Sequence, residues 1–293
     1  MEGQRSIVMQ GAEPAAGVLY LVGTPIGNTG DLSPRAKTVL AGADRIACED
    51  TRRSGLLLHN LGIKNRLVSF HEHNQATRIP ELLEALENGE AIAVISDAGL
   101  PGISDPGEEL VSAARGQGRT VICVPGPCAA TTALVSSGLP CGRFCFEGFL
   151  PPKATARRAR LQALAQEERT LVFYEAPHRL LALLEDLLEL LGDRPVAVTR
   201  ELTKRHEQQV GPNLSEALAH FRLNPPQGEF TLVLGGAEHQ ASERPSDETL
   251  REQLQALVSG GLSRNDAARQ LARSTGIAKR ALYALLHQDD DTP

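Results

Sequence analysis

The chain has 293 residues, of which 41% are hydrophobic and 23% are charged, a composition typical of a globular protein with one large domain or two modest ones. Aromatic residues make up only 3% and tryptophan is absent, which argues against a broad aromatic platform for stacking bases. Because the net charge of −6 repels phosphates, a nucleic-acid partner would need a local basic patch.

Five cysteines occur, an odd number without a CxxC pair. This predicts buried thiols rather than a disulfide framework or a zinc site, and it suits a reducing cytoplasm. Met1 to Gly17 lacks the apolar core of a signal peptide, and no apolar run approaches the ~20 residues of a membrane span. We therefore expect a cytoplasmic protein with no membrane segment and with a disordered leader over residues 1–16.

From residue 18 onward, short apolar runs alternate with amphipathic helical patterns. Strands are predicted at 18–22, 45–48, 66–70, 91–95 and 120–124, and helices at 34–42, 77–88, 106–115 and 129–137. This alternation predicts a mostly parallel sheet covered on both faces. We assign it to an N-terminal α/β domain over residues 17–139.

A second block of strands and helices follows this domain. Strands are predicted at 144–147, 170–174, 195–199 and 230–234, and helices at 154–166, 177–191 and 215–221. They indicate a C-terminal α/β domain over residues 140–238. A polar linker, Glu238 to Pro245, then leads to a small unit that is helical throughout residues 246–287.

Three turns rich in glycine and proline end predicted strands, at residues 23–28, 96–107 and 125–130. None contains a Gly-Lys-Ser/Thr motif or a full GxGxxG motif, so a phosphate loop is weakly supported. One such loop alone is typical of an ordinary turn. Three at the same sheet edge, with the Asp97 carboxylate at a strand end, favour a ligand site.

Polar clusters follow other strands, at residues 48–52, 70–74, 174–179 and 199–204. Their arginines are candidates for holding phosphates, and surface ion pairing is the alternative; these are Arg52, Arg179 and Arg200. His71, Glu72 and His73 lack an evident third ligand for a metal, so we expect no metal site.

The end of the chain carries a local excess of positive charge. Ser263 caps a predicted helix, and Gly276 forms a turn before a second helix, as in a helix-turn-helix. Between residues 263 and 280, five basic residues face one acid, Asp266, which gives a local charge of +4; the five are Arg264, Arg269, Arg273, Lys279 and Arg280. This predicts contact with a nucleic acid, and the alternative is a helical appendage that packs on the body or on a partner subunit.

Eight motifs occur in a characteristic order: 23–28, 49–52, 70–74, 96–107, 125–127, 146–151, 174–179 and 200–204. Together they resemble the ribosomal RNA small subunit methyltransferase I family of the tetrapyrrole-methylase superfamily, from about residue 17 to the end of the chain. The resemblance implies two α/β domains, a homodimer and S-adenosylmethionine bound between the domains. It also implies 2'-O-methylation of a decoding-centre cytidine in 16S rRNA within the small ribosomal subunit.

By position, the resemblance places a group of residues in the cofactor pocket: Pro25, Asp97, Leu100, Ile103, Cys128, Ala129 and Tyr174. The chain departs from the family pattern at three positions. Leu100 stands where Thr is usual, Cys128 where Ser is usual, and Val210 where Arg is usual, so that a charge contact with RNA is lost.

A ribose hydroxyl needs a base or an orienting group, and its developing charge needs a cation. We expect Glu175 or Glu201 in the first role and Lys204 in the second. Arg52, Arg179 and Arg200 would hold phosphates, together with four residues of the tail: Arg269, Arg273, Lys279 and Arg280. Two rival functions remain, a small-molecule tetrapyrrole methylase and a helix-turn-helix DNA-binding regulator.

Overall fold

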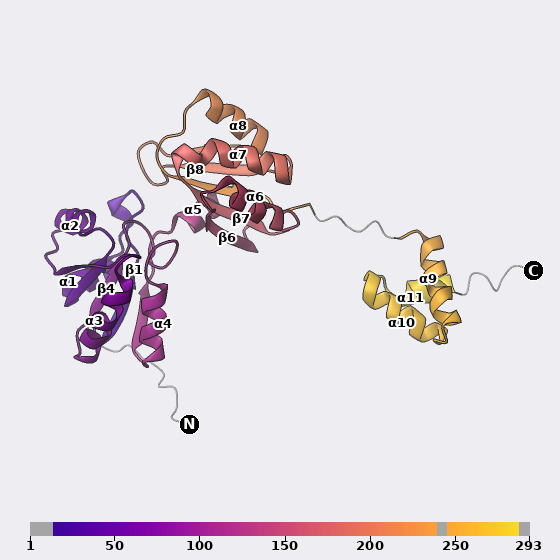
Figure 1. Cartoon of the computed structure of the whole chain (residues 1–293), viewed down its shortest axis with the longest axis horizontal. Helices are drawn as coiled ribbons and strands as arrows, with labels where there is room; N and C mark the ends of the chain where they lie inside the picture. Colours follow the sequence, from indigo (N-terminus) through magenta and orange to yellow (C-terminus); the bar gives the residue numbers. More distant parts are fainter. Residues whose placement is uncertain (1–13, 239–244, 287–293) are drawn as a thin grey trace, which may run out of the picture. The chain divides into compact units, whose positions relative to one another are not determined.

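The computed structural model describes residues 14–238 and 245–286 (Figure 1). It divides after Ala237 into a large unit and a small helical unit, and each is described here by itself. Residues 1–13 of the expected leader, residues 239–244 of the expected linker and His287 lie outside the described residues. The backbone nitrogen of Ala15, inside the expected leader, donates to the Tyr20 hydroxyl at 2.9 Å, so this part of the leader is joined to the first strand.

The first sheet is parallel throughout, as predicted, with the strand order β3-β2-β4-β1-β5. Its strands are β1 (Val18–Val22), β2 (Arg45–Cys48), β3 (Leu67–Ser69), β4 (Ile92–Ile95) and β5 (Thr120–Val124). The carboxyl ends of all five strands therefore meet at one edge, where open α/β sheets bind ligands.

Helices cover both faces of this sheet. α1 (Pro34–Gly42) and α2 (Thr51–Asn60) pack on the face that carries Tyr20 and Ile46, whereas α3 (Gln75–Glu87) and α4 (Glu108–Gly116) pack on the opposite face. A short 3-10 helix, η1 (Thr29–Asp31), follows the first turn. The sequence interpretation missed α2, which begins where the Asp50 side chain accepts a hydrogen bond from the Arg52 backbone.

The second sheet is mixed, with the order β6-β7-β10-β8-β9. Its strands are β6 (Phe144–Phe149), β7 (Thr170–Glu175), β8 (Val196–Arg200), β9 (Gln208–Val210) and β10 (Phe230–Leu234). Only the β6–β7 pair is parallel. The strand β9 was not predicted. Its Val210 side chain is 8% exposed and packs in the hydrophobic core, and the loss of a charge contact with RNA at this position stays a prediction.

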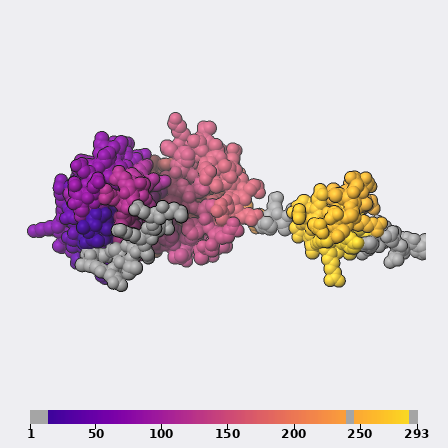
Figure 2. Space-filling model, turned by 90° about the horizontal axis from the view of Figure 1, so that it is seen from below, coloured from indigo at the N-terminus to yellow at the C-terminus, as the bar shows by residue number. Residues whose placement is uncertain are grey.

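Three helices cover one face of the second sheet: α6 (Ala154–Ala163), α7 (Pro177–Leu191) and α8 (Leu214–Leu223). The other face is covered by α5 (Ala129–Ser136), which follows β5 in the chain. Ile26 and Leu202 join the same hydrophobic cluster. These contacts pack the two lobes of the large unit against each other (Figure 2).

The small unit contains three helices among its described residues: α9 (Asp247–Ser259), α10 (Arg264–Thr275) and α11 (Lys279–Leu285). Ser263 caps α10, and Gly276 ends it in the left-handed conformation at φ 69°, which glycine adopts without steric cost. Leu254, Ala268 and Leu282 are fully buried between the helices. No described helix of the chain is long and apolar enough to cross a membrane.

Candidate active site

The three turns rich in glycine and proline lie together at the carboxyl edge of the first sheet. Thr24 and Gly99 exchange backbone hydrogen bonds, with N–O distances of 2.9 and 3.2 Å. The backbones of Gly23 and Gly126 are so close that a Cβ on Gly23 would lie 2.7 Å from the Gly126 Cα. Residues 23–28, 96–107 and 125–130 therefore form one continuous wall.

This wall borders a cavity of about 610 Å³ whose opposite side comes from the second sheet. All the residues expected in the cofactor pocket line it, namely Pro25, Asp97, Leu100, Ile103, Cys128, Ala129 and Tyr174. Glu175 and Lys204 also line it, whereas Glu201, Arg52, Arg179 and Arg200 do not. Other lining residues were not named as site residues from the sequence, among them Glu49, Arg53, Asp105, Phe149 and Glu229.

Tyr174 joins the two lobes at the base of the cavity. Its hydroxyl accepts a hydrogen bond from the Ala130 nitrogen at 3.1 Å, and its ring packs edge-on against Phe146 with centroids 5.0 Å apart. Burial raises the pKa of the Tyr174 hydroxyl, which keeps it neutral. Ile103 and Phe149 remain 38% and 54% exposed, so the cavity offers apolar surface that a ligand would cover.

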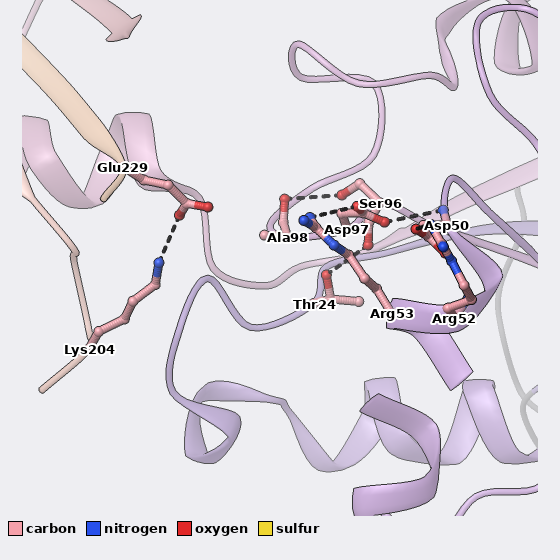
Figure 3. A network of polar contacts seen from close by, with 9 residues as sticks. All are labelled: Thr24, Asp50, Arg52, Arg53, Ser96, Asp97, Ala98, Lys204 and Glu229. Atoms are coloured by element: carbon pink, nitrogen blue, oxygen red, sulfur yellow. Dashed lines mark hydrogen bonds and ion pairs between the residues drawn. The ribbon is translucent and has the colours of Figure 1, made fainter. Parts of the chain in front are cut away.

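Asp97 is held in place by two donors (Figure 3). Its carboxylate accepts from the Asp50 nitrogen at 3.2 Å and from Arg53 Nη1 at 3.0 Å. The Asp50 side chain caps α2 and pairs with Arg52, which lowers the pKa of the Asp50 carboxyl. The Arg52 side chain is 89% exposed, so it lies on the surface, outside the cavity lining.

The two carboxylate oxygens of Glu175 differ in their hydrogen bonds. Its side chain is fully buried; Oε1 accepts from the Ala176 nitrogen at 2.8 Å and lies 3.1 Å from Arg179 Nε. Oε2 has no hydrogen-bond partner among the residues that the structure describes. Burial raises the pKa of this carboxyl. Arg179 also donates to the Leu150 carbonyl at 2.7 Å, so the phosphate-binding role expected for Arg179 competes with two internal contacts.

Lys204 faces the cavity from the loop after β8. Its Nζ lies 3.0 Å from both Glu201 Oε1 and Glu229 Oε2, and Figure 3 shows the Lys204–Glu229 pair apart from the Asp97 network. Hydrogen bonds from Lys204 and from the Glu229 backbone lower the pKa of Glu201. Glu201 and Thr203 have positive φ angles of 53° and 65°, a strain that clusters at functional sites. Glu201 thus contacts Lys204, which lines the cavity, without lining the cavity itself.

The remaining expected site residues lie outside the cavity. Arg200 Nε, at the end of β8, donates to the Gln227 carbonyl. In the small unit, Arg269 lies 3.0 Å from Asp266 and borders a groove on α10 with Arg273. Lys279 and Arg280 occupy the exposed first turn of α11.

The His71 and His73 rings lie 6.0 Å apart. Within residues 14–238 and 245–286, no group of three His, Cys, Asp or Glu side chains is placed to hold a metal ion.

Comparison with known proteins places these features among methylases. The family model for Tetrapyrrole (Corrin/Porphyrin) Methylases matches residues 18–218. The protein of Synechocystis sp. named ribosomal RNA small subunit methyltransferase I is 52% identical over 270 residues, which cover 92% of this chain and 97% of that protein. Its namesake from Escherichia coli O157:H7 is 46% identical over 277 residues, covering 94% and 96%.

A solved structure shares the fold of the large unit. It is the uroporphyrin-III C-methyltransferase from Thermus thermophilus complexed with S-adenosyl homocysteine, which matches with a TM-score of 0.53 and 21% identity. The match covers 73% of this chain and 96% of the other.

Proposed function

Because the chain belongs to the ribosomal RNA small subunit methyltransferase I family of the tetrapyrrole methylases, we propose that it methylates the ribose 2'-oxygen of a decoding-centre cytidine in 16S rRNA. It is an S-adenosylmethionine-dependent methyltransferase of small-subunit ribosomal RNA. The observation that carries the proposal is the single cavity in which the glycine-rich turns, Asp97, Glu175 and Lys204 come together.

The cavity suits S-adenosylmethionine in both shape and charge. The close approach of Gly23 to Gly126 leaves no side chain between these two turns, and Ile103 and Phe149 offer apolar surface to an adenosine group. The carboxylates of Asp97 and Glu49 complement a ligand with a sulfonium and an ammonium group. We assign the ligand to the lining residues Pro25, Asp97, Leu100, Ile103, Cys128, Ala129 and Tyr174. When bound, it supplies a methyl group activated by the positive charge on sulfur.

The residues on the second-sheet side act on the ribose. Glu175 Oε2 is the unpartnered oxygen of a buried carboxyl that lines the cavity, and it orients the 2'-hydroxyl by a hydrogen bond. Lys204 Nζ stabilises the negative charge that develops on the ribose oxygen. Glu201 and Glu229 hold Lys204 in position with contacts of 3.0 Å each, so Glu201 is a positioning residue.

Basic residues outside the cavity hold the RNA backbone. Arg52 supplies an exposed positive charge on the large unit, Arg200 supplies one at the end of β8, and Arg179 supplies one beside Glu175. In the small unit, Lys279 and Arg280 lie in the first turn of α11, where cations oppose the helix dipole. A charge placed against its own helix favours a binding role for Lys279 and Arg280. Arg269 and Arg273 border a groove on α10, and we assign all four residues to phosphate contacts.

The proposed substrate is the assembled small subunit, and the proposed active form is a homodimer in the cytoplasm. The test incubates the protein with radiolabelled S-adenosylmethionine and small subunits that lack the modification. We expect label in 16S rRNA within a dinucleotide that resists alkaline hydrolysis, because a methylated 2'-oxygen cannot attack the neighbouring phosphate.

Two parallel reactions separate this proposal from its rivals. Label transferred to a uroporphyrinogen-type tetrapyrrole but not to small subunits would replace the proposal with a small-molecule methylase. Tight, sequence-specific binding of duplex DNA without methyl transfer would replace it with a DNA-binding regulator.

A further inference from the structure

The loop between β4 and α4 crosses from the first sheet toward the second. Ser104 in this loop has a positive φ of 61°, which non-glycine residues rarely adopt. A Cβ built on Gly148 in β6 would lie 2.9 Å from Ser104 Oγ. Gly148 itself has φ 60° and lies where the β6–β7 register shifts. The strained backbone at Ser104 thus lies against the irregular part of β6 at Gly148, and this contact fixes the position of the residue that follows Ser104.

That residue is Asp105, which lines the cavity together with Tyr174 and Glu49. Charged and titratable groups face it from several elements: Glu49 follows β2, Asp97 follows β4, and Tyr174 lies in β7. Arg53 of α2 also lines the cavity, but its Nη1 is engaged by Asp97. Burial and the charges of Glu49 and Asp97 raise the pKa of Asp105 to about 6, although a hydrogen bond with Ser96 opposes this.

Two other carboxyl groups on the second-sheet side have cations as direct partners. Glu201 is engaged by Lys204 and the Glu229 backbone, which lower its pKa. Burial raises the pKa of Glu175, but Arg179 at 3.1 Å opposes this, and Oε1 of Glu175 is already bonded to the Ala176 nitrogen. The neighbours of Asp105 are anions, which favour an added proton. A carboxylate that binds protons more tightly yet remains mostly ionised at neutral pH is matched to general-base catalysis.

We propose that Asp105, which lines the cavity together with Glu49, is the general base of the reaction. The inference rests on the proposed function above. In the balanced step, an Asp105 carboxylate oxygen takes the proton of the ribose 2'-hydroxyl as the oxygen–methyl bond forms. The bond between sulfur and methyl breaks, and its electron pair remains on sulfur. The products are the 2'-O-methyl ribose, S-adenosylhomocysteine and protonated Asp105, which returns its proton to water.

The first experiment compares Asp105→Asn with the wild type. We expect methyl transfer to small subunits to fall by about 10²–10⁴-fold, the usual contribution of a general base. Calorimetric affinity for S-adenosylmethionine should stay within about threefold, because the base acts on the ribose. The matched control is Asp31→Asn, an exposed carboxyl outside the cavity, which should keep wild-type transfer. Transfer by Asp105→Asn above one-third of the wild-type rate, or loss of cofactor binding together with transfer, would overturn the inference.

The second experiment measures the protonation of Asp105 directly, in the absence of substrate. Carboxyl ¹³C NMR should show one aspartate of the wild type titrating near pH 6, and this resonance should be missing in Asp105→Asn. In Glu49→Gln, loss of a neighbouring anion should move both this titration and the acid limb of kcat/KM to lower pH by roughly 0.5. An unmoved acid limb would remove Asp105 as the base. If the wild type itself transfers no methyl group to small subunits, the proposed function fails instead, whatever the titration shows.

Discussion

At the scale of single residues, the same Asp105 environment that suits catalysis weakens the fold. Its pKa rises from 3.8 to about 6 on folding, so between these pH values the folded protein binds more protons than the unfolded chain. The stability contributed by this carboxyl is therefore fully present below pH 4 and is lost as the pH rises through 6.

Asp105→Asn removes the carboxyl group and with it the loss of stability at high pH. We therefore expect the variant to be more stable than the wild type at pH 8. The gain should be roughly 1–2 kcal/mol, less than the full shift implies because the group is partly exposed. Urea denaturation at pH 8 and at pH 4.5 measures it, and the gain should shrink at the lower pH. An equal difference at both pH values would mean that the substitution acts through packing rather than through the carboxyl's charge.

At the scale of elements, the close packing of two turns makes a separate prediction. A Cβ on Gly126 would lie 2.8 to 2.9 Å from backbone atoms of Gly23, and backbone cannot yield as a flexible side chain does. Gly126→Ala should therefore push the two turns apart and lower the free energy of unfolding by about 1–3 kcal/mol. We expect the affinity for S-adenosylhomocysteine, measured by calorimetry, to fall about tenfold or more.

Gly116→Ala in α4 is the matched control, since a Cβ there meets nothing within 4 Å. It should bind S-adenosylhomocysteine like the wild type. Equal affinities for the two alanine variants would show that the contact between the turns does not shape the cofactor pocket.

The elements also show what a sequence can and cannot predict. Apolar runs of four or five residues located the strands of the first sheet, and parallel order then brought their glycine-rich ends together. The helix α2 was missed because Asp50 and Arg52 were interpreted only as a polar cluster, although Asp50 is its cap. The strand β9 is short and polar, and pairing with β8 makes it a strand. Asp105 was overlooked because a contact between distant residues fixes its place: the side chain of the preceding residue, Ser104, lies close to Gly148, which is 44 positions after Ser104 in the chain.

At the scale of the whole molecule, charge is divided unequally along an acidic chain. The net charge is −6, yet residues 263–280 carry five basic residues and one acid. A protein with a negative net charge does not attract phosphate groups over long distances, so the attraction must come from local basic groups. The small unit has its own hydrophobic cluster, and it therefore presents these groups on a packed scaffold rather than on an extended tail.

Neutralising four of these basic residues tests whether the small unit supplies the attraction for phosphate. We expect weaker binding to small subunits from a combined variant that carries Arg269→Gln, Arg273→Gln, Lys279→Gln and Arg280→Gln. The slope of log affinity against log salt concentration should also become shallower by up to about 3, because each phosphate contact contributes about 0.7–0.9 to this slope. Calorimetric affinity for S-adenosylmethionine should not change, since none of the four lines the cavity. Arg115→Gln with Arg222→Gln, two exposed arginines of the large unit, is the control for net charge. If this control lowers the slope as much as the tail variant does, RNA responds to the overall charge and the helical unit is an appendage with a packing role.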